Sequence, residues 1–226
     1  SDRVELARLA PGVRFFIVRN GTDTSLPPLA PPGASNRTAL WVGGMNDPFN
    51  RAGVVHFAVH ILPRIREQIP DFRWCVVGRD PPPELRALAS DPASGVELAG
   101  FVPSVREAYE RAAIVVVPLV SGGGTKLKVL EAMAMGRAIV TTCVGAEGIE
   151  ARDGMEMEIA STDEEFALKV VALFRDSARR ARIAAAARAL AEREYAWDIV
   201  NRQMGCAVQS VIDADFDVGF SAVCAR

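Results

Sequence analysis

The feature that most constrains the fold is an alternation of short apolar runs and longer amphipathic stretches along most of the chain. The apolar runs are rich in valine, isoleucine and phenylalanine and show no polar alternation, as in strands that are covered on both faces. The stretches between them have helical periodicity, and a helical crossover is the usual connection between parallel strands. The pattern therefore predicts a three-layer α/β fold, with a parallel sheet between two layers of helices.

The alternation also places the individual elements. Strands are predicted at residues 14–18, 39–42, 73–77, 96–98, 114–117, 138–141 and 157–159. Helices are predicted at residues 50–68, 83–89, 104–111, 126–135, 163–175, 175–194 and 198–212. Prolines crowd residues 24–37, so we expect an exposed linker there and a strand at residues 14–18 that is appended to the main domain. The tail after Asp213 shows no pattern.

Composition excludes several classes of protein. The 226 residues include 26 basic and 28 acidic side chains, which gives a formal net charge of −2. Nucleic-acid-binding domains normally carry a basic excess, so nucleic acid is not an expected partner. The apolar runs are shorter than the roughly 20 residues of a membrane helix, and the chain does not open on a signal segment. Because it starts at Ser1 without an initiator methionine, we expect a piece of a longer protein.

Cysteine and histidine give little sign of metal chemistry. The four cysteines stand far apart, with the spacing of neither a zinc site nor a redox motif, so we expect a reducing, cytoplasmic setting. His56 and His60 lie four positions apart on a predicted helix, a spacing that allows a shared metal ion. No glutamate pattern accompanies them, and we therefore favour a pair on the helix surface.

The most informative segment is a glycine-rich loop at residues 121–125, between a predicted strand and a predicted helix. Three consecutive glycines let backbone amides approach a ligand without obstruction by Cβ atoms. The start of the next helix presents unpaired N–H groups and the positive end of its dipole toward the loop. With Lys126 and Lys128 nearby, these features predict a phosphate-binding loop. The alternative is a plain connecting loop.

A carboxylate lies close to this loop. Glu131 falls on the second turn of the predicted helix, inside an apolar run, where burial is costly unless the carboxylate is hydrogen bonded. Ribose hydroxyls are natural partners for an acidic group beside a phosphate-binding loop. The alternative is a glutamate on the helix surface. Neither a Gly-Lys-Ser/Thr run nor a G-x-G-x-x-G pattern is present, which disfavours kinase-like and hydride-transfer functions.

These residues resemble a known family, the retaining glycosyltransferases of family four (glycosyl transferase group 1), which have the two-lobed GT-B fold. Residues 118–142, PLVSGGGTKLKVLEAMAMGRAIVTT, resemble its nucleotide-sugar site almost throughout. The likeness extends to residues 41–45 and 145–148 and covers about residues 39–197. It implies that the chain is one Rossmann-like lobe of a GT-B fold, namely the carboxy-terminal lobe that binds the donor.

The resemblance also implies how the chain is divided. Residues 18–23, VRNGTD, resemble the element that joins the two lobes of the family. The implied parts are an interlobe linker with a residual strand at residues 1–37, a nucleotide-sugar-binding domain at residues 38–197, and a carboxy-terminal helix and tail at residues 198–226. A glycan or lipid-linked acceptor would bind through an amino-terminal lobe that this sequence lacks. The resemblance leaves room for peripheral membrane contact of the full-length protein.

Roles for individual residues follow from the same resemblance. The implied donor site contains Gly43, Gly44, Phe101, Val102, Gly122, Gly123, Gly124, Thr125, Lys128 and Glu131. Glu131 would bind the ribose hydroxyls, Lys128 would supply the cation, and the amides of residues 123–125 would bind the diphosphate. Residues 101–102 would border the base, and residues 43–44 would leave space for the sugar phosphate. General catalytic groups are expected in the missing lobe, and neither a cofactor nor a metal is expected.

Two positions depart from the family pattern. Many members carry a second glutamate eight positions before the one matched by Glu131, whereas this chain has Gly123 there. Many also carry a basic residue in the loop after the first strand, where Arg51 is a candidate substitute. We expect the donor lobe of a hexosyltransferase that is inactive without its amino-terminal lobe. The alternatives are a sugar-nucleotide epimerase of the same fold and a degenerate, non-catalytic nucleotide-binding domain.

Overall fold

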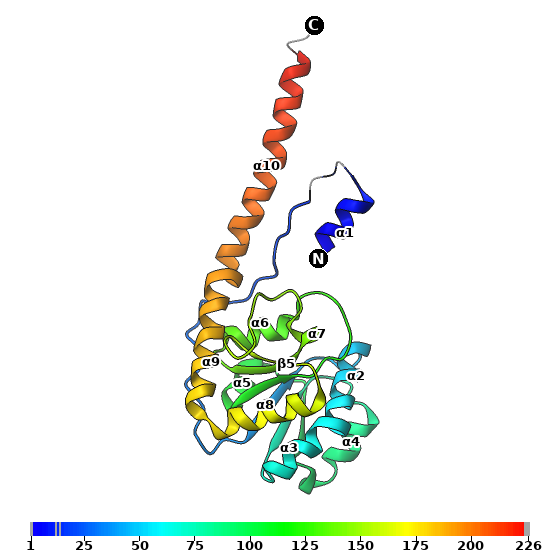
Figure 1. Cartoon of the computed structure of the whole chain (residues 1–226), viewed down its shortest axis with the longest axis vertical. Coiled ribbons are helices and arrows are strands. Elements are labelled where there is room, and N and C mark those ends of the chain that lie inside the picture. The colour runs from blue at the N-terminus through cyan, green and yellow to red at the C-terminus, as the bar shows by residue number, and fades with distance from the viewer. Residues whose placement is uncertain (1, 12, 14, 224–226) are drawn as a thin grey trace.

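A computed structural model describes residues 2–11, 13 and 15–223. Its centre is a six-stranded sheet in the order β3-β2-β1-β4-β5-β6, and every neighbouring pair of strands is parallel (Figure 1). The strands are β1 Thr38–Val42, β2 Arg73–Val77, β3 Val96–Gly100, β4 Ile114–Val117, β5 Ala138–Thr142 and β6 Glu158–Ala160. The predicted three-layer, Rossmann-like fold is confirmed.

Helices follow the strands on both faces of the sheet. They are α1 Asp2–Leu9, α2 Pro48–His56, η1 Phe57–Ile61, α3 Leu62–Gln68, α4 Pro83–Ala89, η2 Pro92–Ser94, α5 Val105–Arg111, α6 Leu127–Ala134, α7 Cys143–Ala146, α8 Asp163–Arg175, α9 Ser177–Leu190, η3 Ala191–Tyr195 and α10 Trp197–Val223. On one face α8 packs against α3 and η1, and on the other α9 packs against α6. Because α2, η1 and α3 follow one another without a break, they match the single helix predicted at residues 50–68.

The strand order determines where a ligand can approach. The chain builds outward from β1 to β3, returns to the other side of β1 and then builds outward from β4 to β6. In a sheet of this order the loops after β1 and β4 diverge, and a crevice opens between them at the carboxyl ends of the strands. The glycine-rich loop follows β4 and Gly43 follows β1, so both lie at this crevice.

The core beside the crevice is aromatic. Trp41 and Trp74 are fully buried on β1 and β2. The Phe57 ring lies 4.5 Å from the Trp74 ring and 5.9 Å from the ring of Phe166 on α8, the latter edge-on. These large side chains fix the helical layer to the sheet, since aromatic pairs add to the free energy gained from burial.

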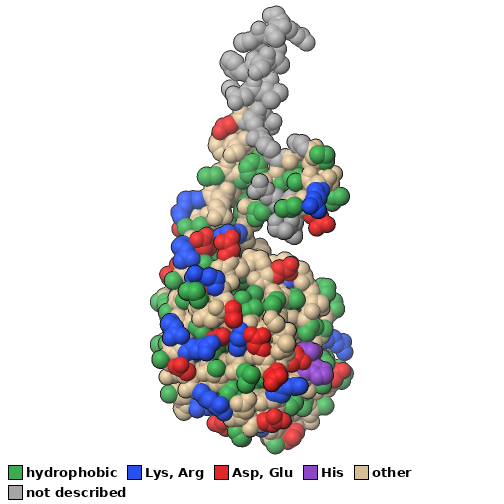
Figure 2. All heavy atoms as spheres, viewed as in Figure 1, with side chains coloured by type: hydrophobic (Ala, Val, Ile, Leu, Met, Phe, Trp, Pro, Cys, Tyr) green, Lys and Arg blue, Asp and Glu red, His purple; other side chains and the backbone are tan. Residues whose placement is uncertain are grey.

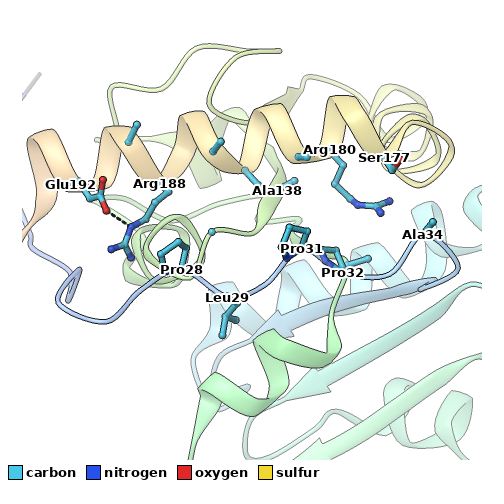
Figure 3. Close-up of a pocket in the computed structure, with 16 residues that line it drawn as sticks. Pro28, Leu29, Pro31, Pro32, Ala34, Ala138, Ser177, Arg180, Arg188 and Glu192 are labelled. Carbon is cyan, nitrogen blue, oxygen red and sulfur yellow. Dashed lines mark hydrogen bonds and ion pairs between the residues drawn. The ribbon is translucent and has the colours of Figure 1, made fainter.

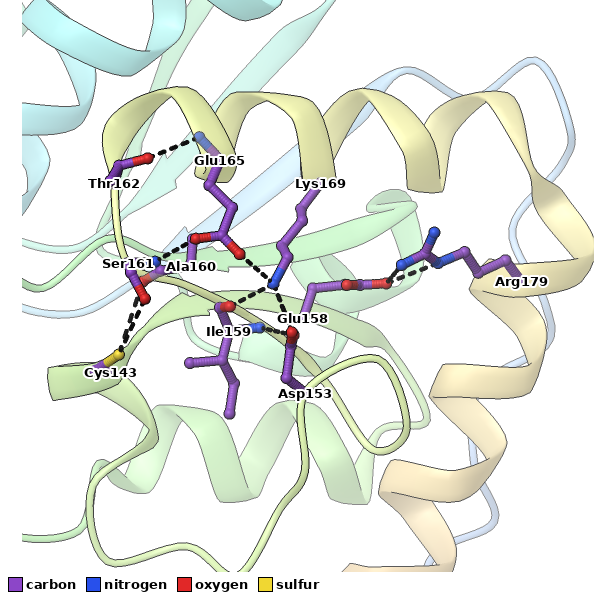
Figure 4. A network of polar contacts seen from close by, with 10 residues as sticks. All are labelled: Cys143, Asp153, Glu158, Ile159, Ala160, Ser161, Thr162, Glu165, Lys169 and Arg179. Atoms are coloured by element: carbon purple, nitrogen blue, oxygen red, sulfur yellow. Dashed lines mark hydrogen bonds and ion pairs between the residues drawn. The ribbon is translucent and has the colours of Figure 1, made fainter.

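A polar network joins β6 to the helices beside it (Figure 4). Lys169 Nζ lies 2.8 Å from a carboxylate oxygen of both Asp153 and Glu165. The Arg179 guanidinium lies 2.6 Å from Oε1 of Glu158, a carboxylate that is almost fully buried. Ion pairs around this edge strand attach it to α8 and to the start of α9. We assign the network a structural role.

The strand predicted at residues 14–18 is wrong. Arg14 lies outside the described residues, and residues 15–21 form no regular secondary structure. The segment passes beside α10, where no strand is available to pair with it (Figure 1). An apolar run becomes a strand only where a partner satisfies its backbone groups, and the first such contact here is an isolated bridge between Thr22 and Ala196.

The proline-rich linker at residues 24–37 is not a free connector. Arg188 of α9 donates hydrogen bonds to the carbonyls of Thr24, at 2.7 Å, and Leu26, at 3.1 Å. Leu29 is buried, and its amide donates to the carbonyl of Met135 at 3.1 Å. Although most of its side chains are exposed as predicted, the segment is held against the domain.

Besides the short helix η2, three helical segments were not predicted. The sequence pattern missed α1, and it assigned α7 to a loop, although the Thr142 hydroxyl accepts a hydrogen bond from the Gly145 amide and so caps it. The third is the end of α10, which continues past Asp213 to Val223. Within the described part of the chain, no helix combines the length and apolar character that a membrane span requires.

Candidate functional site

The glycine-rich loop adopts a backbone that requires glycine. Gly122 has a φ of 114° and Gly124 a φ of 74°, values that other residues rarely adopt. A Cβ atom at Gly122 would lie 3.3 Å from the ring of Phe49, so the loop packs against the start of α2. Cβ atoms at Gly123 or Gly124 would meet no atom within 4 Å. One side of the loop therefore rests on α2, and the other is open.

Lys126 holds the loop in this shape. Its Nζ donates to the carbonyls of Gly123, at 2.8 Å, and Gly124, at 2.7 Å, and lies 3.9 Å from a carboxylate oxygen of Glu147. Because the C=O and N–H of a trans peptide point in opposite directions, the amides of Gly124 and Thr125 face away from the ammonium group. Within the described chain these two amides donate no hydrogen bond, so they are available to an anion.

Lys128 reaches across the crevice from the first turn of α6. Its Nζ lies 3.7 Å from the centre of the Trp41 ring and donates to Oδ1 of Asn50 at 2.6 Å. Asn50 in turn donates to the carbonyl of Gly44 at 2.9 Å. Burial lowers the pKa of Lys128 to about 7, although the charges of Asp47 and Glu131 act in the opposite direction. An anion at this position would favour the protonated ammonium.

The glycines after β1 make room for this lysine. A Cβ atom at Gly43, whose φ is 158°, would lie 2.6 Å from Nζ of Lys128. Gly78 follows the neighbouring strand, and a Cβ atom there would collide with the carbonyl oxygen of Gly43. A Cβ atom at Gly44 would lie 2.8 Å from Oδ1 of Asn46. The structure thus brings the two predicted glycines together with Lys128 and the glycine-rich loop.

Glu131 lies one turn further along α6 and is half-buried. Its Oε2 accepts a hydrogen bond of 3.5 Å from the hydroxyl of Tyr109, a fully buried side chain of α5. Burial raises the pKa of Glu131, although the Tyr109 hydroxyl and the charge of Lys128 act against the shift. A single long hydrogen bond leaves most of the accepting capacity of this carboxylate unused.

Several partners in the site escaped sequence reasoning. Tyr109, Asn50 and Trp41 contact the predicted residues, but each belongs to a different element and lies far from the loop in sequence. Only Asn50 gave a usable signal, since it stands with Phe49 at the start of a helix that follows β1. The other two follow the apolar periodicity of core residues.

Phe101 and Val102 lie apart from this cluster. They follow β3, the edge strand, which two strands separate from β4. Val102 packs against the core, whereas the Phe101 side chain is 66% exposed and lies 4.4 Å from the guanidinium of Arg79. Arg51, the candidate basic residue, is exposed on α2. The structure thus groups the glycine-rich loop with Gly43, Gly44, Lys128 and Glu131.

The two histidines lie side by side at the helix surface, and His56 connects α2 to α8. Nε2 of His56 lies 2.7 Å from Oδ1 of Asp163 at the start of α8, and the ring of His60 is 4.8 Å from that of His56. The described residues contain no group of three or more side chains with metal-ligating chemistry. Cys75, Cys143 and Cys206 are free thiols, and Cys224 lies outside the described residues. Burial raises the pKa of Cys75 to about 11.

Charges on the surface are mixed. Figure 2 shows acidic and basic side chains interspersed over the visible face of the domain, without an extended area of one sign. This distribution agrees with the formal net charge of −2.

Comparison with known proteins identifies relatives. The family described as glycosyl transferases group 1 matches residues 36–176. The phosphatidyl-myo-inositol mannosyltransferase of Mycolicibacterium smegmatis is 27% identical over 194 residues, which cover 84% of this chain and 49% of that protein. The chain spans about half the length of the curated mannosyltransferases that it matches.

Solved structures share the fold at low sequence identity. Sucrose-phosphate synthase (tll1590) from Thermosynechococcus elongatus superimposes with a TM-score of 0.76 at 18% identity, over 94% of this chain and 57% of that one. Anabaena Alr3699/HepE in complex with UDP-glucose superimposes with a TM-score of 0.73 at 16% identity, over 93% of this chain and 62% of that one. The shared fold is that of one GT-B lobe.

Proposed function

The chain belongs to the glycosyl transferases of group 1, and we propose that it is the donor-binding lobe of a retaining hexosyltransferase. Its donor would be a nucleoside diphosphate sugar, and its acceptor would come from outside this lobe. One observation carries the proposal: an open glycine-rich loop with free amides lies beside Lys128 and Glu131 at the crevice of the sheet. Amides, an ammonium group and a carboxylate match a diphosphate next to a ribose.

The chemistry of transfer explains why such a loop is useful. When the glycosidic bond to the leaving diphosphate breaks, negative charge builds up on the phosphate oxygens. The amides of Gly124 and Thr125 are already oriented by Lys126, so they stabilise this charge without reorganising. Lys128 would add a positive charge that binding of the diphosphate itself strengthens, because an adjacent anion raises the pKa of an ammonium group.

The rest of the donor would be contacted in two places: the ribose by Glu131 and the sugar by backbone groups near Gly123. Glu131 keeps free accepting capacity at the crevice, which suits the two hydroxyls of a ribose. Gly123, where the family pattern led us to expect a glutamate, is open on its outer side, so contacts to the sugar would come from backbone groups. We propose no general base within this chain.

The relatives favour a hexose and a nucleoside diphosphate. The M. smegmatis relative is a mannosyltransferase, and the Anabaena structure contains UDP-glucose. Since this chain spans about half of its curated relatives, acceptor binding and turnover would need the remaining part of the enzyme. We propose residues 38–197 as the donor-binding domain, residues 1–37 as the interlobe linker, and the helix and tail at residues 198–226 as the return toward the other lobe.

Calorimetry on this chain tests the proposal. Titration with UDP, GDP and ADP, and with their glucose and mannose derivatives, should give binding of one base in the micromolar to millimolar range, as is common for enzyme substrates. Absence of heat with every nucleotide would contradict it. The longer protein should transfer hexose with retention of configuration, which NMR of the product detects. An epimerised donor would favour the epimerase alternative, and binding without donor hydrolysis would favour a degenerate domain.

A further inference from the structure

A cavity lies at the opposite end of the strands from the glycine-rich loop. It is a groove of about 660 Å³ between α9 and the proline-rich segment (Figure 3). Its walls are formed by Pro28, Pro31, Pro32, Ala181, Ala185 and Ala189. Its floor includes Ala113 and Ala138, at the amino ends of β4 and β5. The groove is therefore separate from the donor crevice at the carboxyl ends.

At one end of this groove, every guanidinium nitrogen of Arg188 already donates a hydrogen bond to another group of the protein. Nε of Arg188 donates to Glu192 at 2.6 Å, and the other two nitrogens donate to backbone carbonyls of the proline-rich segment and of Ala134. Figure 3 shows the ion pair with Glu192 beside Pro28. Arg188 thus attaches the segment to α9 and closes the groove.

The arginine at the other end has no such partners. The side chain of Arg180 extends from α9 toward Pro32 and Ala34 (Figure 3) and is only 3% exposed. Within the described chain its guanidinium makes one hydrogen bond, to the carbonyl of Leu173 at 2.9 Å, and no carboxylate lies within 4.0 Å. The guanidinium of Arg37 is close enough to repel it, which adds to burial in lowering the pKa of Arg180, although the charge of Asp176 acts in the opposite direction.

This arrangement needs an explanation. A buried charge that forms no ion pair destabilises a folded protein, and the positive charge of Arg37 increases the cost, which Asp176 offsets only in part from beyond ion-pair distance. The nitrogens of Arg180 that make no hydrogen bond are not enclosed in the core, so they face the groove. A planar guanidinium pairs best with a carboxylate, which accepts two parallel hydrogen bonds. The proline and alanine walls offer only apolar contacts.

We propose that this groove binds an apolar small molecule that carries a carboxylate. The carboxylate would pair with Arg180 beside Arg37, and the apolar body would lie along the alanine face of α9. The volume of about 660 Å³ lies within the range of small-molecule sites, roughly 300–1,000 Å³. The groove and its charge do not depend on the donor site, so this inference stands independently of the proposed transferase activity.

Laurate at concentrations below those at which it forms micelles is a suitable probe for this chain. Calorimetry should show laurate binding at least about tenfold more tightly than dodecanol, which lacks the charge, or acetate, which lacks the chain. Dodecyltrimethylammonium, with the opposite charge, should not bind. Equal binding of laurate and dodecanol, or no binding of laurate, would overturn the proposal.

Two variants test the head and the body of the site separately. Arg180→Gln should weaken laurate binding at least about tenfold, and the exposed Arg182→Gln on the same helix is the matched control. Ala185→Leu fills the groove while Arg180 stays in place and should also abolish binding, whereas Ala178→Leu, outside the groove, should not. If Arg180→Gln does not fold, the alanine pair still decides. Unchanged laurate affinity in Ala185→Leu would contradict the proposal.

Discussion

Charged groups are arranged differently at the two ends of the strands, which we call the carboxyl edge, with the glycine-rich loop, and the amino edge, with the groove. At the carboxyl edge, Lys128 is already paired with Asn50 and Trp41, and the groups proposed to bind the anion are backbone amides that Lys126 orients. At the amino edge, the guanidinium of Arg180 is buried in an apolar groove, and no carboxylate of the described chain lies within ion-pair distance of it. The first edge is built from loop geometry, and the second from side chains brought together by packing. Loop geometry should therefore be more sensitive to small backbone changes.

The largest effect should come from the close approach of two glycines at the carboxyl edge. Gly78→Ala would place a Cβ atom against the carbonyl oxygen of Gly43 at a φ of 157°. Because that oxygen belongs to the backbone, the ends of β1 and β2 must separate, and we expect a loss of about 3 kcal/mol or more in the free energy of unfolding. Urea denaturation measures this loss.

Gly33→Ala is the matched control at the amino edge. A Cβ atom at Gly33 would meet nothing within 4 Å, so the free energy of unfolding should change by less than about 0.5 kcal/mol. If both variants were equally stable, the carboxyl edge would not be the more constrained of the two.

The next largest effect separates binding from stability at Glu131. Glu131→Gln should weaken nucleotide binding about tenfold to a hundredfold, because it removes a charged acceptor for the ribose hydroxyls. Burial raises the folded-state pKa of Glu131, so its ionised form destabilises the free protein above that pKa. Stability at pH 7 should therefore stay equal or rise. Calorimetry and urea denaturation measure the two quantities.

Glu107→Gln, at an exposed position of α5, is the control for this variant and should change neither quantity. A loss of both binding and stability in Glu131→Gln would mean that the carboxylate has a structural role. At the amino edge, in contrast to Glu131→Gln, the substitution Arg180→Gln should leave nucleotide binding unchanged.

A pH dependence distinguishes Lys128 from the permanently charged arginines of the other edge. Its folded-state pKa of about 7 lies below the usual 10.5, so the unfolded chain holds the extra proton between these values. The stability of the free protein should thus rise with pH across this interval. Nucleotide affinity should fall by about tenfold from pH 7 to pH 9, where the diphosphate is already fully ionised.

Lys128→Met removes the titrating group and should flatten both profiles. Its affinity at pH 7 should be about tenfold lower than that of the unchanged chain. A falling affinity profile that survives in the variant would assign the pH dependence to another group.

The sequence could place most of the candidate site at the carboxyl edge, because those residues are contiguous. The glycine-rich loop, Lys128 and Glu131 lie within residues 122–131, on one loop and the two helical turns that follow it. Tyr109 and Trp41 could not be assigned, since only tertiary packing brings them to Glu131 and Lys128.

The amino edge was beyond sequence reasoning for the same physical cause. Its groove joins residues 28–34 to a helix about 150 positions later, and Arg180 looks like any surface arginine in an alanine-rich helix. The prediction of a strand at residues 14–18 was wrong because an apolar run does not by itself supply a hydrogen-bonding partner for its backbone. Local patterns thus predicted the elements and the loop, whereas contacts between distant segments had to come from the structure.

The smallest effect should come from Lys126, which shapes the loop without facing the open side. Lys126→Met removes two hydrogen bonds to the carbonyls of Gly123 and Gly124, so the amides would have to be ordered when the nucleotide binds. Net hydrogen bonds of this kind contribute about 1 kcal/mol, and we expect about a threefold to fivefold loss of affinity without a change in its pH dependence. Calorimetry at pH 7 and pH 9 compares it with Lys128→Met. If Lys126→Met lost more affinity than Lys128→Met and flattened the pH profile, Lys126 would be the cation that contacts the diphosphate.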